Sequence, residues 1–153
     1  MSRRKNMEKC IKVAGLFIAS LQSLAIIHTR NHWLCKGDNF YSEHNLFERL
    51  YDAALEDLDS AAEKFVGLFG PECLDLDLQT SLIAKATLIY KKVEGDHAAQ
   101  SLAAERNFLK LCADAYACFE EHGKMTLGLD DFIMAMANSH EEAVYLLQQN
   151  SNQ

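Results

Sequence analysis

The sequence predicts an all-α protein, a four-helix bundle with one short extra helix in the connection between the second and third long helices. The 153 residues include one proline and seven glycines, so residues that interrupt helices are rare. Apolar residues recur at alternating spacings of three and four, as on one face of a helix. Hydrophobic residues make up 49% of the chain, enough for one sizeable core. We therefore expect a single domain over residues 1–153.

The first helix is expected from about Met7 to Cys35, after a short basic tail formed by residues 1–6. A turn over residues 36–39 carries the glycine and the capping residue that end one helix and start another. The apolar stripe of this first helix consists of Ile11, Ala14, Ile18, Leu21, Ala25, His28 and His32.

The remaining elements follow from stop signals in the chain. A second helix is expected over 40–69, ended by Gly70 and Pro71, and a loop over 74–77 precedes a shorter helix over 78–93. A third long helix is expected over 97–122, and the fourth starts near Leu129 or Asp130 and ends near Gln149, before a polar tail of residues 150–153. The tight first turn makes the first pair antiparallel, and the long middle connection returns the chain to the starting end.

Composition limits the location of the protein. No apolar run approaches membrane-spanning length, and the apolar stretch 11–27 is interrupted by Ser20, Gln22 and Ser23, which favours a helix of the mature domain over a signal peptide. The five cysteines are scattered and form no CxxC pair. This pattern predicts a reduced, cytoplasmic protein whose cysteines act mostly as small buried apolar residues.

His32 and His44 lie on two helices joined by the turn around Gly37 to Asn39. Each is about six residues from the turn centre, so an antiparallel hairpin places them at the same height. The two imidazoles can then face a common point, as ligands of one metal ion do.

Asp59 and Glu63 are spaced i, i+4 and share one face of the second helix. Taken alone, this pair favours a solvated acidic face, to which Glu56 and Asp57 would contribute. Combined with imidazoles, the carboxylates would suit Fe(II) or a similar divalent ion. However, His44 and Asp59 are 15 residues apart, which is about 22 Å along a helix. Within one chain the two pairs cannot meet.

A second copy of the chain would close this gap. If two copies of the second helix cross antiparallel about an axis near Asp52 and Ala53, position 44 lies opposite about position 61, between Asp59 and Glu63. Each dimer would hold two identical sites, because a two-fold interface is reciprocal. Small residues would permit this close approach, namely Ala53, Ala54, Ala61 and Ala62.

The segment from His32 to Lys64 resembles the signature of the Dps family of mini-ferritins, whose bundle is ferritin-like. That signature has His-Trp, Lys/Arg-Gly and Phe, a second His twelve residues after the first, then Asp and Glu fifteen and nineteen residues after the second. Lys64 stands where the family has Arg in its Ala-Glu-Arg motif. The matching residues here are His32, Trp33, Lys36, Gly37, Phe40, His44, Asp59 and Glu63.

The resemblance implies a ferroxidase that oxidises Fe(II), usually with hydrogen peroxide and otherwise with O₂, and stores Fe(III) in a hollow shell of twelve subunits built from two-fold dimers. Such iron storage protects against oxidative damage. The catalytic iron ligands would be His32, His44, Asp59 and Glu63. Trp33 would lie beside the site, either as an electron donor or as packing.

The resemblance also suggests an iron-entry pore and a DNA contact. Asp131 falls where the family has a pore aspartate, with Asp130 beside it, but the acids usual just upstream are missing from Met125 to Gly128. The alternative is that Asp130 caps the last helix and Asp131 is a first-turn charge. DNA contact would use Arg3, Arg4 and Lys5, but the short extension and the net charge of −7 favour a solvated N-terminus.

Two alternative functions remain open. The first is a Dps-like DNA-binding or structural shell with little ferroxidase activity, which only the basic N-terminus favours. The second is a different ferritin-like bundle with another metal. The missing pair of Glu-x-x-His motifs, typical of di-iron carboxylate bundles, argues against it.

Overall fold

The computed structural model describes residues 2–151, which are helical apart from short connections. One 3₁₀ turn, η1, follows the second helix. The elements in chain order are α1 (Arg3–Leu34), α2 (Phe40–Phe69), η1 (Pro71–Leu74), α3 (Leu76–Lys91), α4 (His97–Glu121) and α5 (Leu127–Ser151).

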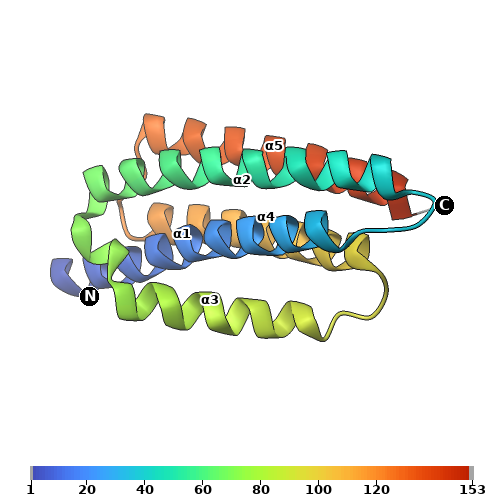
Figure 1. Ribbon diagram of the computed structural model, residues 1–153. Helices are drawn as coiled ribbons and strands as arrows, with labels where there is room; N and C mark the ends of the chain where they lie inside the picture. The colour runs from blue at the N-terminus through green and yellow to red at the C-terminus, as the bar shows by residue number, and fades with distance from the viewer. Residues whose placement is uncertain (1, 152–153) are drawn as a thin grey trace.

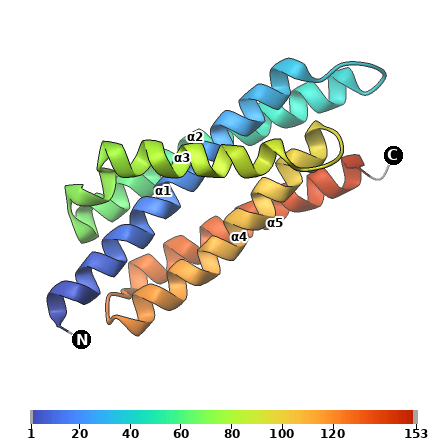
Figure 2. The same cartoon turned by 90° about the horizontal axis from the view of Figure 1, so that it is seen from below.

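The four long helices form a bundle with one crossover. α1 and α2 form an antiparallel hairpin, and α4 and α5 form a second one (Figure 1). Between the hairpins, α3 runs across the outside of α1 (Figure 2). It carries the chain back along the bundle, so that α2 and α4 run in the same direction. The predicted fold class, including the short extra helix, is therefore the one observed.

Most predicted boundaries lie within a few residues of the observed ones, and α2 has the predicted bounds. The largest difference is at the N-terminus, where α1 starts at Arg3 because the Ser2 side chain accepts a hydrogen bond from the Lys5 backbone nitrogen. Residues 3–6, expected as a basic tail, are therefore helical, and residue 1 lies outside the described part. α3 starts at Leu76, so the loop predicted over 74–77 is wrong: Leu74 ends the 3₁₀ turn, Asp75 caps α3, and residues 76–77 are helical.

The last helix is longer than expected at both ends. It starts at Leu127, because Thr126 Oγ1 accepts a hydrogen bond from the Leu129 backbone nitrogen at 3.1 Å. Asp130 consequently lies in the first turn and is not the cap. At the other end the helix continues to Ser151, so residues 150–151 of the predicted polar tail are helical, and residues 152–153 are outside the described residues.

α1 is the central helix of the bundle. A stretch of it is long and apolar enough to cross a membrane by length and composition, which corrects the expectation that no such run exists. Most of that stretch is buried in this structure, where α1 packs against α2, α3 and α4. Burial on several sides explains the apolar composition, as it does for the core helix of a soluble protein.

Aromatic rings fill the half of the core nearest the α4–α5 connection. Phe17 of α1 meets Phe65 of α2 and Phe108 of α4 edge to face, with ring centroids 5.1 and 5.0 Å apart. Phe69 and Phe119 stack at 5.0 Å. Phe132 of α5 also meets Phe65 edge to face at 6.1 Å, so ring contacts of the geometry that aromatic pairs prefer join all four long helices.

The other half of the core contains a polar network that connects all four long helices. Glu105 of α4 is 1% exposed and lies between two histidines. Its Oε1 is 2.8 Å from His28 Nε2 of α1, and its Oε2 is 2.5 Å from His140 Nδ1 of α5. His140 Nε2 reaches Asp57 of α2 at 2.9 Å. The network continues to Ser101, whose Oγ lies 3.0 Å from the other ring nitrogen of His28, Nδ1.

One assignment of hydrogens satisfies this network. Asn31 donates to Ser101 Oγ at 2.8 Å, and the Ser101 hydroxyl donates to His28 Nδ1. His28 then donates from Nε2 to Glu105, while a protonated His140 donates to Glu105 and Asp57. The network thus holds two carboxylates and one imidazolium with every donor paired, as buried charges require.

The pKa shifts agree with these charges. Burial alone would raise the pKa of Glu105, but hydrogen bonds from His140 and His28 outweigh it and lower the pKa to about 2. Burial alone would lower the pKa of His140, but hydrogen bonds to Asp57 and Glu105 raise it to about 9. Both groups are therefore charged at neutral pH.

These shifts predict how stability depends on pH. Glu105 stabilises the fold above its ordinary pKa of 4.5, and this contribution is lost as pH falls toward about 2. His140 stabilises the fold below its ordinary pKa of 6.5, and this contribution is lost as pH rises through about 9. We expect the free energy of unfolding, measured with urea across pH, to decline on both sides of the interval between the two ordinary pKa values.

Replacing Glu105 by glutamine should lower the free energy of unfolding at pH 6 by about 3–5 kcal/mol, because His140 keeps its charge and loses one of two carboxylates. The acid arm of the pH profile should also flatten. Glu94→Gln, an exposed loop acid, is the matched control. A Glu105→Gln protein as stable as this control would show that the network is not charged as described.

Candidate metal centre

The His32 and His44 side chains lie together where α1 and α2 meet at the hairpin turn. Their rings are stacked, with centroids 3.7 Å apart and planes 22° apart. His32 is buried and His44 is half-buried. The antiparallel register predicted from their distances to the turn therefore places the two rings side by side.

Each histidine ring is oriented by the backbone of the other residue. His32 Nδ1 is 2.8 Å from the carbonyl oxygen of His44, and His44 Nδ1 is 3.1 Å from the carbonyl oxygen of His32. A carbonyl oxygen only accepts, so both Nδ1 atoms must carry a hydrogen. In each neutral ring the lone pair is then on Nε2, and neither Nε2 has a hydrogen-bond partner within residues 2–151. Histidines that bind metals are commonly oriented in this way.

Aromatic rings surround the histidine pair. Phe40 stacks on His44 with centroids 4.9 Å apart, and Tyr51 meets the His32 ring edge to face at 5.3 Å. Trp33, the next residue after His32, is 73% exposed. The histidines are therefore held rigidly on the inner side, while a large indole ring extends from the same helix end into solvent.

Asp59 and Glu63 lie further along α2 and do not reach the histidines within one chain. Both are exposed, and neither makes a hydrogen bond or an ion pair within residues 2–151. Three or more metal-ligating groups come close together elsewhere in the described residues, but not here. Within one chain the four predicted ligands thus form two separate groups. His32 of α1 lies with His44 of α2, and Asp59 lies with Glu63 further along α2.

The outer face of α2 connects the two halves. Asp52, Leu55 and Glu56 are exposed on it, and Leu55 is 49% exposed. Of the four alanines expected to allow close approach of a partner, Ala54 and Ala61 are fully buried in the core of the same chain. This corrects the expectation, because only Ala53 and Ala62, both half-buried, remain available to a second subunit.

The predicted pore aspartates occupy different environments in the first two turns of α5. Asp131 is exposed, whereas Asp130 is half-buried. Asp130 Oδ1 is inaccessible to solvent and has no hydrogen-bond partner within the described residues. The alternative reading of Asp130 as the helix cap is excluded by Thr126, which fills that role.

The basic residues Arg3, Arg4 and Lys5 are exposed in the first turn of α1. Positive charges in a first turn oppose the helix dipole. Their position on an ordered helix differs from that of a free basic tail, which is the element expected to contact DNA.

The sequence patterns do not predict the polar network in the core, although they place His28 on the apolar stripe of the first helix. A signal was present, since Glu105 and His140 each stand on an apolar stripe where helix spacing demands a buried residue. For His140 that stripe is Leu129, Ile133, Met136, Ala143 and Leu147. A charged residue at such a position indicates a buried partner on another helix, but not which one.

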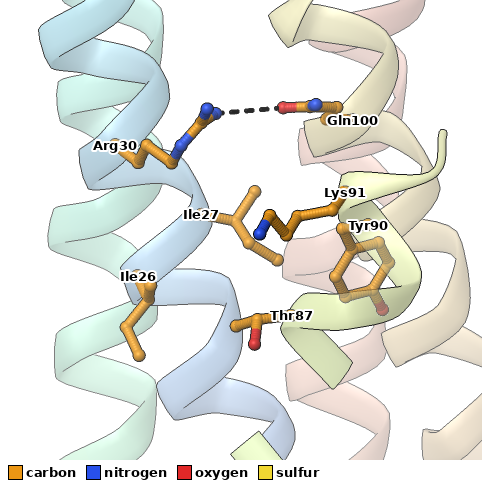
Figure 3. Close-up of a pocket in the computed structure, with 7 residues that line it drawn as sticks. All are labelled: Ile26, Ile27, Arg30, Thr87, Tyr90, Lys91 and Gln100. Carbon is orange, nitrogen blue, oxygen red and sulfur yellow. Dashed lines mark hydrogen bonds between the residues drawn. The ribbon is translucent and has the colours of Figure 1, made fainter. Parts of the chain in front are cut away.

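A pocket of about 240 Å³ lies away from the histidine pair, between α1, α3 and the start of α4. Among its lining residues, Arg30 donates a hydrogen bond to Gln100 Oε1 at 3.5 Å (Figure 3). It contains none of the predicted ligands. Its lining residues are Ile26, Ile27, Arg30, Thr87, Tyr90, Lys91 and Gln100.

Comparison with known proteins gives a likeness of structure and none of sequence. No protein-family model matches the chain, and no curated protein matches it. The solved structure of Dps from Thermosynechococcus elongatus is similar, with a TM-score of 0.79 and 16% identity over 97% of this chain and 94% of that one. The structure of Dps from Microbacterium arborescens in the high iron form has a TM-score of 0.75 and 18% sequence identity, over 97% of this chain and 95% of that one.

Dps from Mycobacterium smegmatis gives a TM-score of 0.74 and 15% identity, over 98% of this chain and 89% of that one. These alignments include the helix in the middle connection as well as the four long helices, because they extend over nearly the whole chain. The protein therefore has the ferritin-like fold of the Dps structures.

Proposed function

We propose that this chain is the subunit of a mini-ferritin that oxidises Fe(II) at sites shared between two subunits and stores Fe(III) inside a hollow shell. The observation that carries the proposal is the reciprocal bonding of His32 and His44. It fixes both rings with Nδ1 occupied and Nε2 available. The likeness to Dps structures over nearly the full chain supports the same reading.

The ligand chemistry suits iron. Two imidazoles with two carboxylates, His32, His44, Asp59 and Glu63, offer the mixed nitrogen and oxygen donors that Fe(II) accepts. Asp59 and Glu63 are unpaired within the described chain and exposed on α2. A partner's α2 crossing antiparallel would bring the partner's carboxylates to this chain's histidines and, by symmetry, the reverse.

In the proposed reaction, iron is the substrate and the protein supplies position and charge. Two Fe(II) ions each give one electron to hydrogen peroxide, the O–O bond breaks, and two protons complete two water molecules. Asp59 and Glu63 would offset the charge that each iron gains. Oxidation by O₂ is the alternative. Trp33, exposed beside the pair, would either supply electrons or pack against the partner subunit.

The assembly belongs to the same proposal. We infer a cytoplasmic dodecamer built from two-fold dimers, which protects the cell by consuming peroxide and iron together. The net charge of −7 per chain would concentrate cations near the shell. Asp131 is exposed at the start of α5 and is the better candidate for an iron-entry pore, while Asp130 is half-buried.

A complementation experiment tests the shared site. We expect that His32→Ala/His44→Ala and Asp59→Asn/Glu63→Gln proteins each lose rapid Fe(II) oxidation by peroxide, followed by absorbance of Fe(III). Co-expressed in equal amounts, the two variants should recover about one quarter of the wild-type rate. The reason is that half of the dimers are mixed and each mixed dimer has one intact site of two.

Glu94→Gln again serves as the control, because it removes an exposed carboxylate far from α2. If the co-expressed variants show no Fe(II) oxidation, the site is not shared across a dimer. Wild-type rates in either parent variant would show that iron is oxidised elsewhere.

The exposed face of α2 gives a second prediction. Leu55 lies between the two halves of the site and close to the proposed axis, so Leu55→Glu should separate the dimer although all four ligands remain. We expect light scattering to show a smaller particle and peroxide-driven Fe(II) oxidation to fall about tenfold or more. Tyr145→Glu, a comparably exposed residue of α5, should change neither measurement.

DNA binding is not part of the proposal. The basic residues Arg3, Arg4 and Lys5 are helical, and the chain carries a net charge of −7. We expect no retardation of duplex DNA in a gel-shift titration at physiological salt. A shift that disappears on changing these three residues to alanine would instead favour the alternative of a DNA-binding shell.

A further inference from the structure

A cluster of sulfur and nitrogen ligands lies at the opposite end of the bundle from the α1–α2 turn. The start of α1 and the end of α4 lie at this same end (Figures 1 and 2). Cys10 belongs to α1, Cys118 to the last turn of α4, and His122 directly follows α4 as its cap. One ligand atom from each lies within 4.8 Å of the other two.

The spacing within the cluster is close to that of a metal site. Tetrahedral zinc, with bonds of about 2.3 Å to sulfur and about 2.0 Å to nitrogen, separates its ligand atoms by about 3.5–3.8 Å. Cys118 Sγ and His122 Nδ1 are 3.7 Å apart on one helix face. Cys10 therefore needs a shift of no more than about 1 Å, since it lies within the 4.8 Å limit.

The histidine is already held beside the thiols. His122 Nδ1 is 2.7 Å from the carbonyl oxygen of Cys118, one turn back on α4, so Nδ1 carries a hydrogen here, and a metal bound at Nδ1 would replace that hydrogen bond. Cys10 is buried, and Cys118 and His122 are half-buried. The site is thus reachable from solvent on the α4 side and closed on the α1 side.

Two lysines lie near the thiols of the cluster, Lys124 near Cys10 and Lys9 near Cys118. A divalent ion bound here would neutralise the two thiolates that hold it.

We propose that Cys10, Cys118 and His122 bind Zn²⁺ with three protein ligands and one further position. Thiolate ligands select zinc over iron(II), which prefers the histidines and carboxylates of the proposed oxidation site. The two sites share no residue, and Cys10 and His32 lie toward opposite ends of α1. The zinc proposal therefore stands or falls independently of the proposed function.

Cobalt(II) is the probe, because thiolate ligands give it a charge-transfer absorption that histidine and carboxylate sites lack. Reduced protein is titrated with Co²⁺ and then with Zn²⁺. We expect one sulfur-bound cobalt per chain, displaced by zinc. Binding should strengthen as pH rises, because each thiol releases a proton.

Cys118→Ser should weaken cobalt binding by more than about 100-fold, since even outer partners of metal ligands contribute about 10–100-fold. His122→Asn, a change at a helix end, should keep the sulfur band and reduce affinity, so a folding defect in one variant does not decide the test. Cys73→Ser is the matched control, since Cys73 is buried and outside the cluster.

Absence of a thiolate–cobalt band in the reduced wild-type protein would overturn the proposal. A band of unchanged strength in both Cys118→Ser and His122→Asn would overturn it as well. Loss of the band in Cys118→Ser together with its retention in Cys73→Ser supports it.

Discussion

The buried charge of Glu105 is the constraint on which the arrangement of the bundle depends. An ionised carboxylate cannot be removed from water without partners, and its partners here come from α1 and α5, with Asp57 of α2 completing the set. Apolar side chains can slide past one another at little cost, whereas these hydrogen bonds fix the height of each helix. The network thus determines the relative heights of α1 and α2, and with them the geometry of the hairpin that carries His32 and His44.

The two halves of the core have different tasks. Near the α4–α5 connection, stacked and edge-on phenylalanines supply apolar burial, which is strong but undirected. Nearer the hairpin turn, the directional hydrogen bonds of the polar network fix the positions of the helices relative to one another. Both proposed metal sites border these regions, with Cys10 and His32 buried and the other ligands half-buried or exposed, within reach of solvent or of another subunit.

The helices were predictable because periodic apolar residues, scarce breakers and a few capping signals act locally along the chain. The exact start of α1 could not be predicted, because the Ser2 cap outweighs the repulsion among Arg3, Arg4 and Lys5. The adjacency of His32 and His44 followed from the turn. The hydrogen bonds from each histidine ring to the backbone carbonyl of the other residue did not follow from the turn, because they depend on ring orientation. The pairing of Glu105 with His28 and His140, and the proximity of Cys10 to Cys118 and His122, bring together residues distant in sequence, which spacing alone cannot predict.

The bonding of the histidine pair has a consequence for how such a chain can change over time. Because the orienting acceptors are main-chain carbonyls, they are present whatever side chains surround them. Substitutions nearby can therefore accumulate widely without turning the rings. A residue inserted into or deleted from the turn over 36–39 would instead move one carbonyl away from its imidazole. Loop length, rather than residue identity, is then the property that selection would have to preserve at this end of the molecule.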